Sequence, residues 1–338
     1  MEISACVKAP LRGREAVMAK NGDFIGMART LKGRLVLTGI GLHSGQSVTM
    51  TLWPAPLATG LLFRRRDLME GVSAESQAAT LDRVTIKAHP ASVSATTLGT
   101  VISNRFGVSV STVEHILAAL SGAGIDHALI DVDGPEVPIM DGSAAPFSQA
   151  IAQTGTRSLG AARDYWRLNR PLMVKKGGSL IAAMPLDPEE TPRLALDVTV
   201  DYADAAIGRQ SLSLDPAHGL FNDELANART FCHFKDVEAM RAQGLALGGS
   251  LDNAIVVDNG SILNEGGVRR DREFVRHKAL DLIGDLHLLG APLAARLVAM
   301  KPGHDINTQF AKQVLDEGAV TLAQAHDTAA VSARAVGA

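Results

Sequence analysis

Cysteine is almost absent from this sequence, whose 338 residues include only Cys6 and Cys232. Two cysteines, one of them near the start of the chain, provide no disulfide framework, which is typical of proteins from a reducing compartment. The first 26 residues scatter charges among short apolar runs and lack the continuous apolar core of a secretory signal peptide. We therefore expect a cytoplasmic protein.

An excess of charge of one sign is also missing. Lys and Arg total 33 against 36 Asp and Glu, a net charge of −3, and aromatic residues make up 4% of the chain. Without a basic field or many rings on which bases could stack, nucleic acid is not an expected partner. No apolar run approaches the roughly 18 residues that a membrane-spanning helix needs, so no transmembrane segment is expected.

Several catalytic motifs are missing as well. The sequence contains no Walker A loop, no HExxH, no paired CxxC and no GxSxG elbow. Gly39 and Gly41 are not followed by a third glycine at the dinucleotide-binding spacing, and no helix is predicted after them. Nucleotide hydrolysis, dinucleotide chemistry and serine hydrolysis are therefore not expected.

What the sequence does contain is two similar successions of strands and helices. Hydrophobic residues make up 46% of it, and its length suffices for two ordinary cores, so two domains are predicted. Periodicity predicts strands at 34–38, 47–52, 60–64, 83–87, 128–132, 166–174, 179–184, 194–200 and 295–300, and helices at 111–120, 141–154 and 271–289. The run 157–163 loses its periodicity and marks the predicted boundary. Each half places strands before a helix with an internal histidine, then a glycine and an apolar strand, which indicates a weak internal repeat.

The first histidine helix carries two polar residues beside its core face. Its apolar stripe consists of Val113, Ile116, Leu117 and Leu120. Glu114 and His115 lie off this stripe and face either solvent or another element. Ser111 and Glu114 also have the spacing of a capping box, which is the commoner explanation for a glutamate at this position.

The second histidine helix has a polar stripe made of His277, Lys278, Asp281 and Asp285. His277 and Asp281 are four residues apart, so one turn of helix can bring an imidazole nitrogen and a carboxylate oxygen to the same ion. The alternative is an ordinary solvated helix face, on which such pairs are common.

Together the two helices could form a catalytic zinc site, which needs three protein ligands and one open position. His115, His277 and Asp281 would supply the ligands, and Glu114 is next to a ligand and could take the proton of an attacking water. His304 is predicted in a turn after the strand 295–300. Beside Asp305 or Asp285 it could stay protonated and stabilise an oxyanion or protonate a leaving amine; an exposed histidine without a role is the alternative. His43, between Gly41 and Gly45, could approach a metal but is better explained by a hairpin turn.

Five segments carry a specific resemblance. They are STVEH at 111–115, PIMDGSA at 138–144, ARTF at 228–231, RHK at 276–278 with Asp281, and GH at 303–304. In this order they resemble the UDP-3-O-acyl-N-acetylglucosamine deacetylase family, zinc enzymes of lipid A biosynthesis in Gram-negative bacteria. The resemblance extends from about residue 30 to about residue 322.

This resemblance implies an α+β fold of two similar domains, each a two-layer β-α-α-β sandwich, with the active site at their interface. The corresponding divisions are an N-terminal extension at 1–26, expected to be disordered, domain I at 27–163, domain II at 164–322 and a C-terminal tail at 323–338. An insert at about 231–263 would form a hydrophobic passage for a fatty acyl chain. The residues expected to line it are Leu245, Leu247, Ile255 and Val256.

The resemblance also implies a role for each site residue. His115, His277 and Asp281 would bind Zn²⁺, for which Fe²⁺ could substitute because His and Asp ligands accommodate either ion. Glu114 would be the general base. The other implied roles are general acid for His304, support of His304 for Asp285, oxyanion stabilisation and substrate positioning for Thr230 and Lys278, and packing against the nucleotide-sugar for Phe231.

The function implied is hydrolysis of the N-acetyl group of UDP-3-O-(3-hydroxyacyl)-N-acetylglucosamine to the free amine and acetate, the committed step of lipid A biosynthesis. We expect a monomer whose partner is this UDP-linked substrate. Two alternatives remain at this point: a zinc amidohydrolase that acts on another acylated amide, and a non-catalytic ligand-binding module whose His/Asp cluster is structural.

Overall fold

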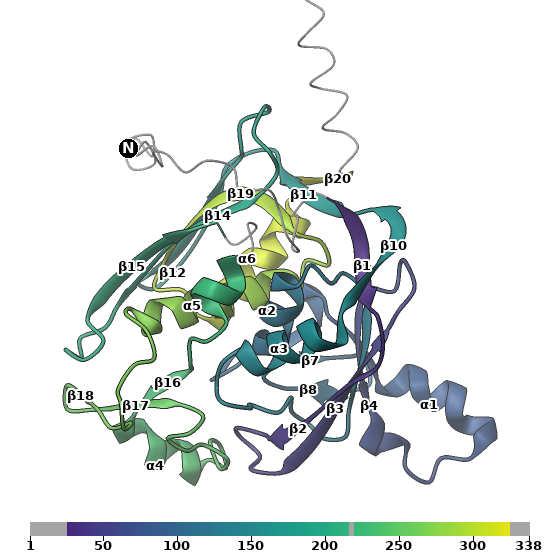
Figure 1. Ribbon diagram of the computed structural model, residues 1–338, viewed down its shortest axis with the longest axis horizontal. Coiled ribbons are helices and arrows are strands. Elements are labelled where there is room, and N and C mark those ends of the chain that lie inside the picture. The colour runs from purple at the N-terminus through teal and green to yellow at the C-terminus, as the bar shows by residue number, and fades with distance from the viewer. Residues whose placement is uncertain (1–25, 216–219, 325–338) are drawn as a thin grey trace, which may run out of the picture.

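Two main sheets lie on either side of a layer of helices in the computed structural model, which describes residues 26–215 and 220–324 (Figure 1). The fold is α+β, as predicted. The first sheet has the order β2(Leu35–Ile40), β3(Ser47–Pro54), β9(Ala128–Val132), β4(Leu61–Arg65) and β5(Thr85–Lys87). Only the β4 and β9 pair is parallel.

The second sheet repeats this arrangement. It contains the order β12(Leu172–Lys176), β13(Ser179–Met184), β19(Leu293–Met300), β14(Leu194–Asp201) and β15(Arg209–Leu214), extended by β11(Asp164–Leu168) and β20(Val320–Gln324). Its central strand β19 runs antiparallel to β13 and parallel to β14, just as β9 runs antiparallel to β3 and parallel to β4. The weak internal repeat seen in the sequence is thus a repeat of topology.

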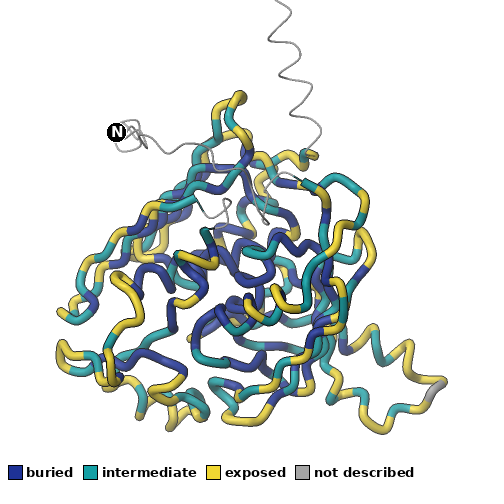
Figure 2. The backbone as a smooth tube through the Cα atoms, in the orientation of Figure 1, coloured by how far each residue is buried: buried dark blue, intermediate teal, exposed yellow. Residues whose placement is uncertain are grey.

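Strand alternation matches the faces of these sheets. In β3, Val48, Met50 and Leu52 are buried while the residues between them are partly exposed. The pattern recurs in β14, where every second residue is buried. One face of each sheet therefore packs on the helix layer, and the buried residues concentrate there (Figure 2).

The helix layer consists of α2(Glu114–Gly122) and α3(Ala145–Thr154) from the first half with α5(Glu273–His287) and α6(His304–Asp316) from the second. Helices α2 and α5 pack directly on each other. A Cβ at Gly284 would lie 2.1 Å from the backbone oxygen of Glu114, so only glycine permits this close crossing. Every residue of α5 except Lys278 is buried, which excludes the solvated face considered for its polar stripe.

Each half also carries a small three-stranded sheet before its first layer helix. In the first half it comprises β6(Val93–Ala95), β7(Val101–Ser103) and β8(Ser109–Val110). In the second it comprises β16(Phe231–His233), β17(Ile255–Asp258) and β18(Ser261–Ile262), with α4(Phe234–Ala242) beside it. Strands β1(Met27–Leu31) and β10(Thr156–Ala162) form a separate antiparallel ribbon, and α1(Gln77–Val84) projects from the first half (Figure 1).

Several sequence predictions of local structure were wrong. The predicted capping box does not form: α2 begins at Glu114, its N-cap Val113 makes no side-chain bond, and Ser111 instead bridges to Glu136. Thr112, between Ser111 and the start of the helix, has a φ of 58°. This left-handed residue ends the extended segment just before α2. The Glu114 carboxylate is engaged elsewhere, as described below.

Element boundaries also differ from the predictions. All but the last residue of the run 157–163, predicted as an aperiodic boundary, lies in strand β10, whose partner β1 is far away in sequence. The single strand predicted at 166–174 is two strands, β11 and β12, and most of the strand predicted at 83–87 is β5 after the end of α1. Helix α3 begins at Ala145 rather than at residue 141.

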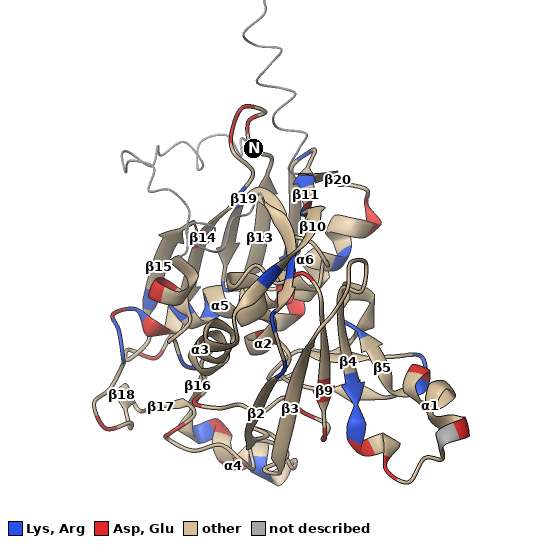
Figure 3. Cartoon of the chain, turned by 45° about the vertical axis from the view of Figure 1, so that its right-hand side comes forward, with Lys and Arg blue, Asp and Glu red and all other residues tan. Residues whose placement is uncertain are grey.

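Most of the two predicted terminal segments lies outside the described residues. Of the predicted extension 1–26, only Gly26 is among the described residues, and of the predicted tail 323–338 only the end of β20 is. Charged residues of both signs are intermixed along the two halves (Figure 3). None of the helices in the described ranges is long and apolar enough to cross a membrane.

Candidate metal centre and active site

Three side chains from two helices converge where α2 crosses α5. His115 comes from the first turn of α2, and His277 and Asp281 come from successive turns of α5. The Nε2 atoms of His115 and His277 lie 3.6 Å and 3.2 Å from Oδ1 of Asp281, and all three residues are buried. The two imidazole rings are nearly perpendicular, with centroids 5.0 Å apart.

These residues fit a divalent metal ion such as zinc. Tetrahedral ligands about 2.0 to 2.1 Å from zinc lie roughly 3.4 Å from each other, which is close to the two observed separations. Oδ1 of Asp281 is buried without a hydrogen-bond partner among the described residues, an arrangement that is costly unless an ion binds there. Nδ1 of His277 donates to the carbonyl oxygen of Ala228 at 3.0 Å, which leaves its Nε2 free as a ligand.

Burial and charge hold His277 and Asp281 in the protonation states that bind metal. Burial lowers the pKa of His277 to about 3, against the opposing charge of Asp281, so the ring is neutral and its Nε2 carries a lone pair. Burial alone would raise the pKa of Asp281. The adjacent His277 ring and the Lys278 ammonium outweigh burial and hold that pKa well below its usual value. Asp281 is therefore an anion at neutral pH.

Glu114 lies beside this cluster. Its Oε2 accepts a hydrogen bond from the backbone N–H of Thr100 at 2.9 Å, and the residue is buried. Burial raises the pKa of this carboxyl, while His304 and His115 counteract it. A buried carboxylate with a raised pKa is well suited to accept a proton.

His304 lies close to both Glu114 and Asp281. It is the first residue of α6 rather than part of a turn, and its side chain is only 12% exposed, so the exposed histidine without contacts is excluded. Nε2 of His304 is 3.9 Å from Oε1 of Glu114 and 3.9 Å from Oδ2 of Asp281. Of its two predicted partners the structure brings Asp285 to the ring, because Asp305 pairs with Lys176 at 2.6 Å.

Asp285 is the centre of a small buried network. It accepts from His304 Nδ1 at 3.0 Å, from Asn307 Nδ2 at 2.9 Å and from the Thr100 hydroxyl at 2.6 Å. Burial alone would lower the pKa of His304. The charges of Asp285 and Glu114 outweigh burial and raise that pKa to about 9. The ring is thus a cation at neutral pH, next to a carboxylate that is ready to accept a proton.

Lys278 and Phe231 form the next part of the site. Nζ of Lys278 donates to Oδ2 of Asp281 at 2.9 Å and lies 5.3 Å from the ring centroid of Phe231. Burial alone would lower the pKa of Lys278, but Asp281 raises it above its usual value. Thr230 is fixed by backbone bonds, donating to Gly142 and accepting from Ile255, both at 2.8 Å.

An apolar cavity of about 360 Å³ opens beside these groups. Thr230, Phe231, Lys278 and His304 line the end near the metal cluster, and the wall continues into the insert. The apolar wall includes Leu42, Leu98, Phe234, Val237, Met240, Leu251, Val256 and Leu263. A site with a few polar groups at one end of an apolar cavity is the usual form of a small-molecule site.

The residues predicted to line the acyl passage are only partly at this cavity. Val256 lines it, whereas Leu245, Leu247 and Ile255 are not among its lining residues. Leu247 is 52% exposed, and Ile255 packs in a separate small core with Phe274. Leu42, in the turn after β2, and Leu98, between β6 and β7, contribute from the first half instead.

His43 is in that turn, as predicted, and not at the metal cluster. Its Nδ1 accepts from the backbone of Ala246 at 3.3 Å and its Nε2 lies 3.3 Å from the Leu98 carbonyl. The backbone N–H of His43 donates to the buried carboxylate of Glu136. The histidine therefore joins the first half to the insert.

Sequence inspection missed Thr100, Asn307 and the carbonyl of Ala228. Backbone groups have no sequence signature, and Thr100 is part of a segment without clear periodicity. The one available signal was Gly284, since a glycine inside a long helix costs about 1 kcal/mol and usually has a packing reason.

Comparisons with known proteins agree with this geometry. Residues 28–316 match the family model of the UDP-3-O-acyl N-acetylglycosamine deacetylases (LpxC). The chain is 43% identical over 308 residues to the UDP-3-O-acyl-N-acetylglucosamine deacetylase of Anaeromyxobacter sp. (strain Fw109-5), which is 90% of this chain and 94% of that relative. It is 44% identical over 287 residues to that of Acidithiobacillus ferrooxidans and 42% identical over 289 residues to that of Vibrio cholerae, each covering 85% of this chain and 89% of the relative.

Proposed function

Because the chain belongs to the UDP-3-O-acyl N-acetylglycosamine deacetylase family, we propose that it removes the N-acetyl group from UDP-3-O-(3-hydroxyacyl)-N-acetylglucosamine. The products are acetate and the free amine, and the reaction is the committed step of lipid A biosynthesis. The observation that carries this proposal is the buried His115, His277 and Asp281 cluster at the polar end of an apolar cavity.

The proposed resident ion is Zn²⁺, with Fe²⁺ as the alternative, held by His115, His277 and Asp281. Bound there, it would supply Lewis acidity, which polarises an amide carbonyl and lowers the pKa of water. Three ligands drawn from two helices leave room for substrate, as catalytic sites require.

Glu114 and His304 divide the proton transfers between them. Glu114 accepts the proton of the water that attacks the acetamide carbonyl. His304, protonated at neutral pH because of Asp285, donates its Nε2 proton to the departing amine nitrogen. The 3.9 Å between Oε1 of Glu114 and Nε2 of His304 supports the proposal that both act on one substrate amide.

Thr230 and Lys278 line the same end of the cavity. Their hydroxyl and ammonium groups stabilise the oxyanion that forms on the acetyl carbonyl and position the sugar. The Phe231 ring packs against the nucleotide-sugar. The apolar wall takes the 3-O-acyl chain, since such a chain is the part of the substrate that gains from leaving water.

The decisive test is acetate release by the purified protein, combined with metal analysis of the same preparation. We expect turnover of the full substrate, about one metal ion per chain, and a large loss of rate when the 3-O-acyl chain is removed. Undiminished turnover of a substrate without UDP or without the acyl chain would favour a general acylated-amide hydrolase. No metal and no acetate release would favour a non-catalytic module.

The remaining proposals concern the setting of the enzyme. We propose a monomer in the cytoplasm without nucleic-acid partners, supported by the scarcity of cysteine, the net charge of −3 and the low aromatic content. Size-exclusion chromatography with light scattering tests the oligomeric state directly.

A further inference from the structure

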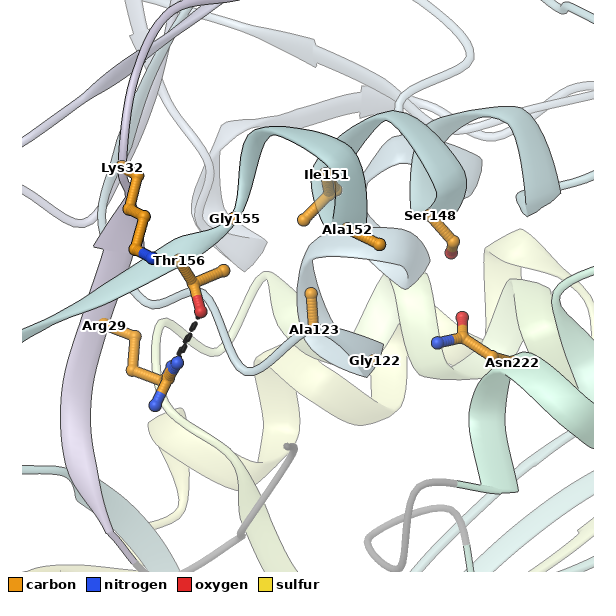
Figure 4. Close-up of a pocket in the computed structure, with 10 residues that line it drawn as sticks. All are labelled: Arg29, Lys32, Gly122, Ala123, Ser148, Ile151, Ala152, Gly155, Thr156 and Asn222. Carbon is orange, nitrogen blue, oxygen red and sulfur yellow. Dashed lines mark hydrogen bonds between the residues drawn. The ribbon is translucent and has the colours of Figure 1, made fainter. Parts of the chain in front are cut away.

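A second cavity, of about 460 Å³, lies at the opposite end of α2 from the metal cluster. It is formed by the ends of α2 and α3, the ribbon of β1 and β10, and the short π-helix at Phe221–Leu225 (Figure 4). Helix α2 has nine residues, so its length separates the two sites by about 13 Å. The two cavities share no lining residue.

One end of this cavity is cationic. Arg29 Nε donates to the Thr156 hydroxyl at 3.2 Å, and no carboxylate pairs with the guanidinium within residues 26–215 and 220–324. The exposed Lys32 likewise has no carboxylate partner in the described part of the chain. Both side chains lie at the same end of the cavity (Figure 4), so two positive charges face one space without a negative charge to match them.

The other end is polar and uncharged. Ser148 is 9% exposed, and its hydroxyl is buried without a hydrogen-bond partner among the described residues. The Asn222 side chain points toward it across the gap (Figure 4). A buried hydroxyl without a partner is unfavourable unless another molecule occupies the space and bonds to it. Between the two ends, Ile151 and small alanine side chains form an apolar floor.

We propose that this cavity is a second ligand-binding site, for a small molecule with an oxyanion on an apolar body. A carboxylate or phosphate binds Arg29 and Lys32 through charge-assisted hydrogen bonds. The apolar body covers Ile151, and a polar group at its far end meets Ser148 and Asn222. The site is independent of the deacetylation chemistry, because none of its residues is at the metal cluster.

The two cations also lie near the carboxyl ends of α2 and α3, where positive charge stabilises the helix dipole. That role accounts for the charges but leaves the Ser148 hydroxyl and the open space unexplained. A purely structural role predicts that the cations stabilise the fold and bind nothing, which separates the two explanations by experiment.

Binding is tested on the full chain by isothermal titration calorimetry with phenyl phosphate, phenylacetate and the neutral benzyl alcohol. The two anions distinguish a phosphate ligand from a carboxylate ligand. We expect at least one anion to bind and benzyl alcohol not to bind. Lys32→Gln should weaken that binding roughly tenfold or more.

Lys312→Gln is the matched control, because it removes the same charge from an exposed residue of α6 outside the cavity. It should leave the affinity unchanged, and Lys32→Gln should leave acetate release unchanged. An anion bound at the metal centre would instead keep its affinity in Lys32→Gln and lose it in Asp281→Asn. That result, equal effects of the two lysine variants, or the absence of binding by both anions at about 1 mM would overturn the proposal.

Discussion

Compared strand by strand, the sheet β2-β3-β9-β4-β5 and the strands β12-β13-β19-β14-β15 have one order and one pattern of parallel and antiparallel pairs. In each half the chain forms a three-stranded sheet between the edge strand, β5 or β15, and the first layer helix. These two small sheets contribute different parts of the candidate site. The first brings Thr100 onto Glu114 and Asp285, whereas the second forms most of the apolar cavity wall.

The layer helices differ in a similar way. Helix α2 contributes Glu114 and His115 from its first turn, while α5 contributes His277 and Asp281 from its interior. The two halves therefore share one topology, which packs α2 against α5. They differ in the residues that each helix brings to the site. In the proposed mechanism the second half provides most of the metal ligands and the general acid, and the first half provides the general base.

The largest effect on the rate should come from removing a metal ligand that the second half contributes. Asp281→Asn removes the anionic ligand and should lower both bound metal and acetate release, the latter by at least about a thousandfold. Metal content by atomic spectroscopy and initial rates check this. Asp252→Asn, the same change at an exposed position in the insert, should leave both unchanged. Full metal occupancy in Asp281→Asn would contradict the assignment.

The first half's contribution is tested with Glu114→Gln. Because the amide cannot accept the proton of water, the rate should fall roughly 10² to 10⁴-fold while the metal stays bound. The amide oxygen can still accept the Thr100 N–H, so the fold is preserved. Glu238→Gln on α4 is the matched control. Loss of metal together with loss of rate would mean that the two halves do not divide the chemistry as described.

The pH dependence of the rate tests the contribution of His304 and Asp285, both from the second half. The alkaline limb of the rate should follow His304, whose pKa is raised to about 9 mainly by Asp285 against the effect of burial. Asp285→Asn removes that negative charge, so the pKa of His304 falls and the alkaline limb moves to lower pH. The rate at neutral pH should drop about ten- to a hundredfold.

Asp305→Asn provides the control for this shift. Asp305 follows His304 in the sequence but pairs with Lys176 at the surface, so its substitution should leave the alkaline limb in place. If Asp305→Asn moved the limb and Asp285→Asn did not, Asp285 would have no role in keeping His304 protonated.

The smallest effect concerns how the two halves are held together. His287 of α5 lies 3.2 Å from the Ile125 carbonyl of the first half, and burial lowers its pKa from 6.5 to about 4. Between these pH values the unfolded chain binds a proton that the folded chain does not. The contribution of the buried, neutral His287 to the free energy of unfolding is therefore complete above about pH 6.5 and is lost as the pH falls toward 4. From pH 6.5 down to pH 5 the loss should be about 2 kcal/mol of stability.

His287→Gln should flatten this part of the stability profile, measured by urea unfolding at pH 8 and pH 5. At pH 8 the histidine is neutral in both states, so the difference between the two proteins reports only the altered contact with Ile125. An unchanged slope between pH 8 and pH 5 in the variant would show that other groups cause the acid sensitivity.

Much of the fold and of the candidate site could be predicted from local sequence patterns. Alternation located β3 and β14, helical periodicity located α2 and α5, and the spacing of His277 and Asp281 placed two ligands on one face. The spacing of Ser111 and Glu114 was misleading, because the same spacing that forms a capping box here precedes a helix that starts at Glu114 itself.

Other features were beyond local patterns. Leu42, rather than Leu245 or Leu247, lines the cavity because the turn after β2 contacts the insert about two hundred residues later. The choice of Asp285 over Asp305 as the partner of His304 depends on the packing of α6 against α5.

The sequence by itself determined which residues are polar on each helix, because periodicity is a property of neighbouring residues along one chain segment. Only the tertiary structure decided that those polar faces are buried against each other and that Thr100 and Ala228 orient them. The close crossing at Gly284 brings Glu114 and His115 to His277 and Asp281, and burial there sets the pKa values on which the chemistry depends. Desolvation and long-range charge depend on three-dimensional neighbours, which no spacing along the chain specifies.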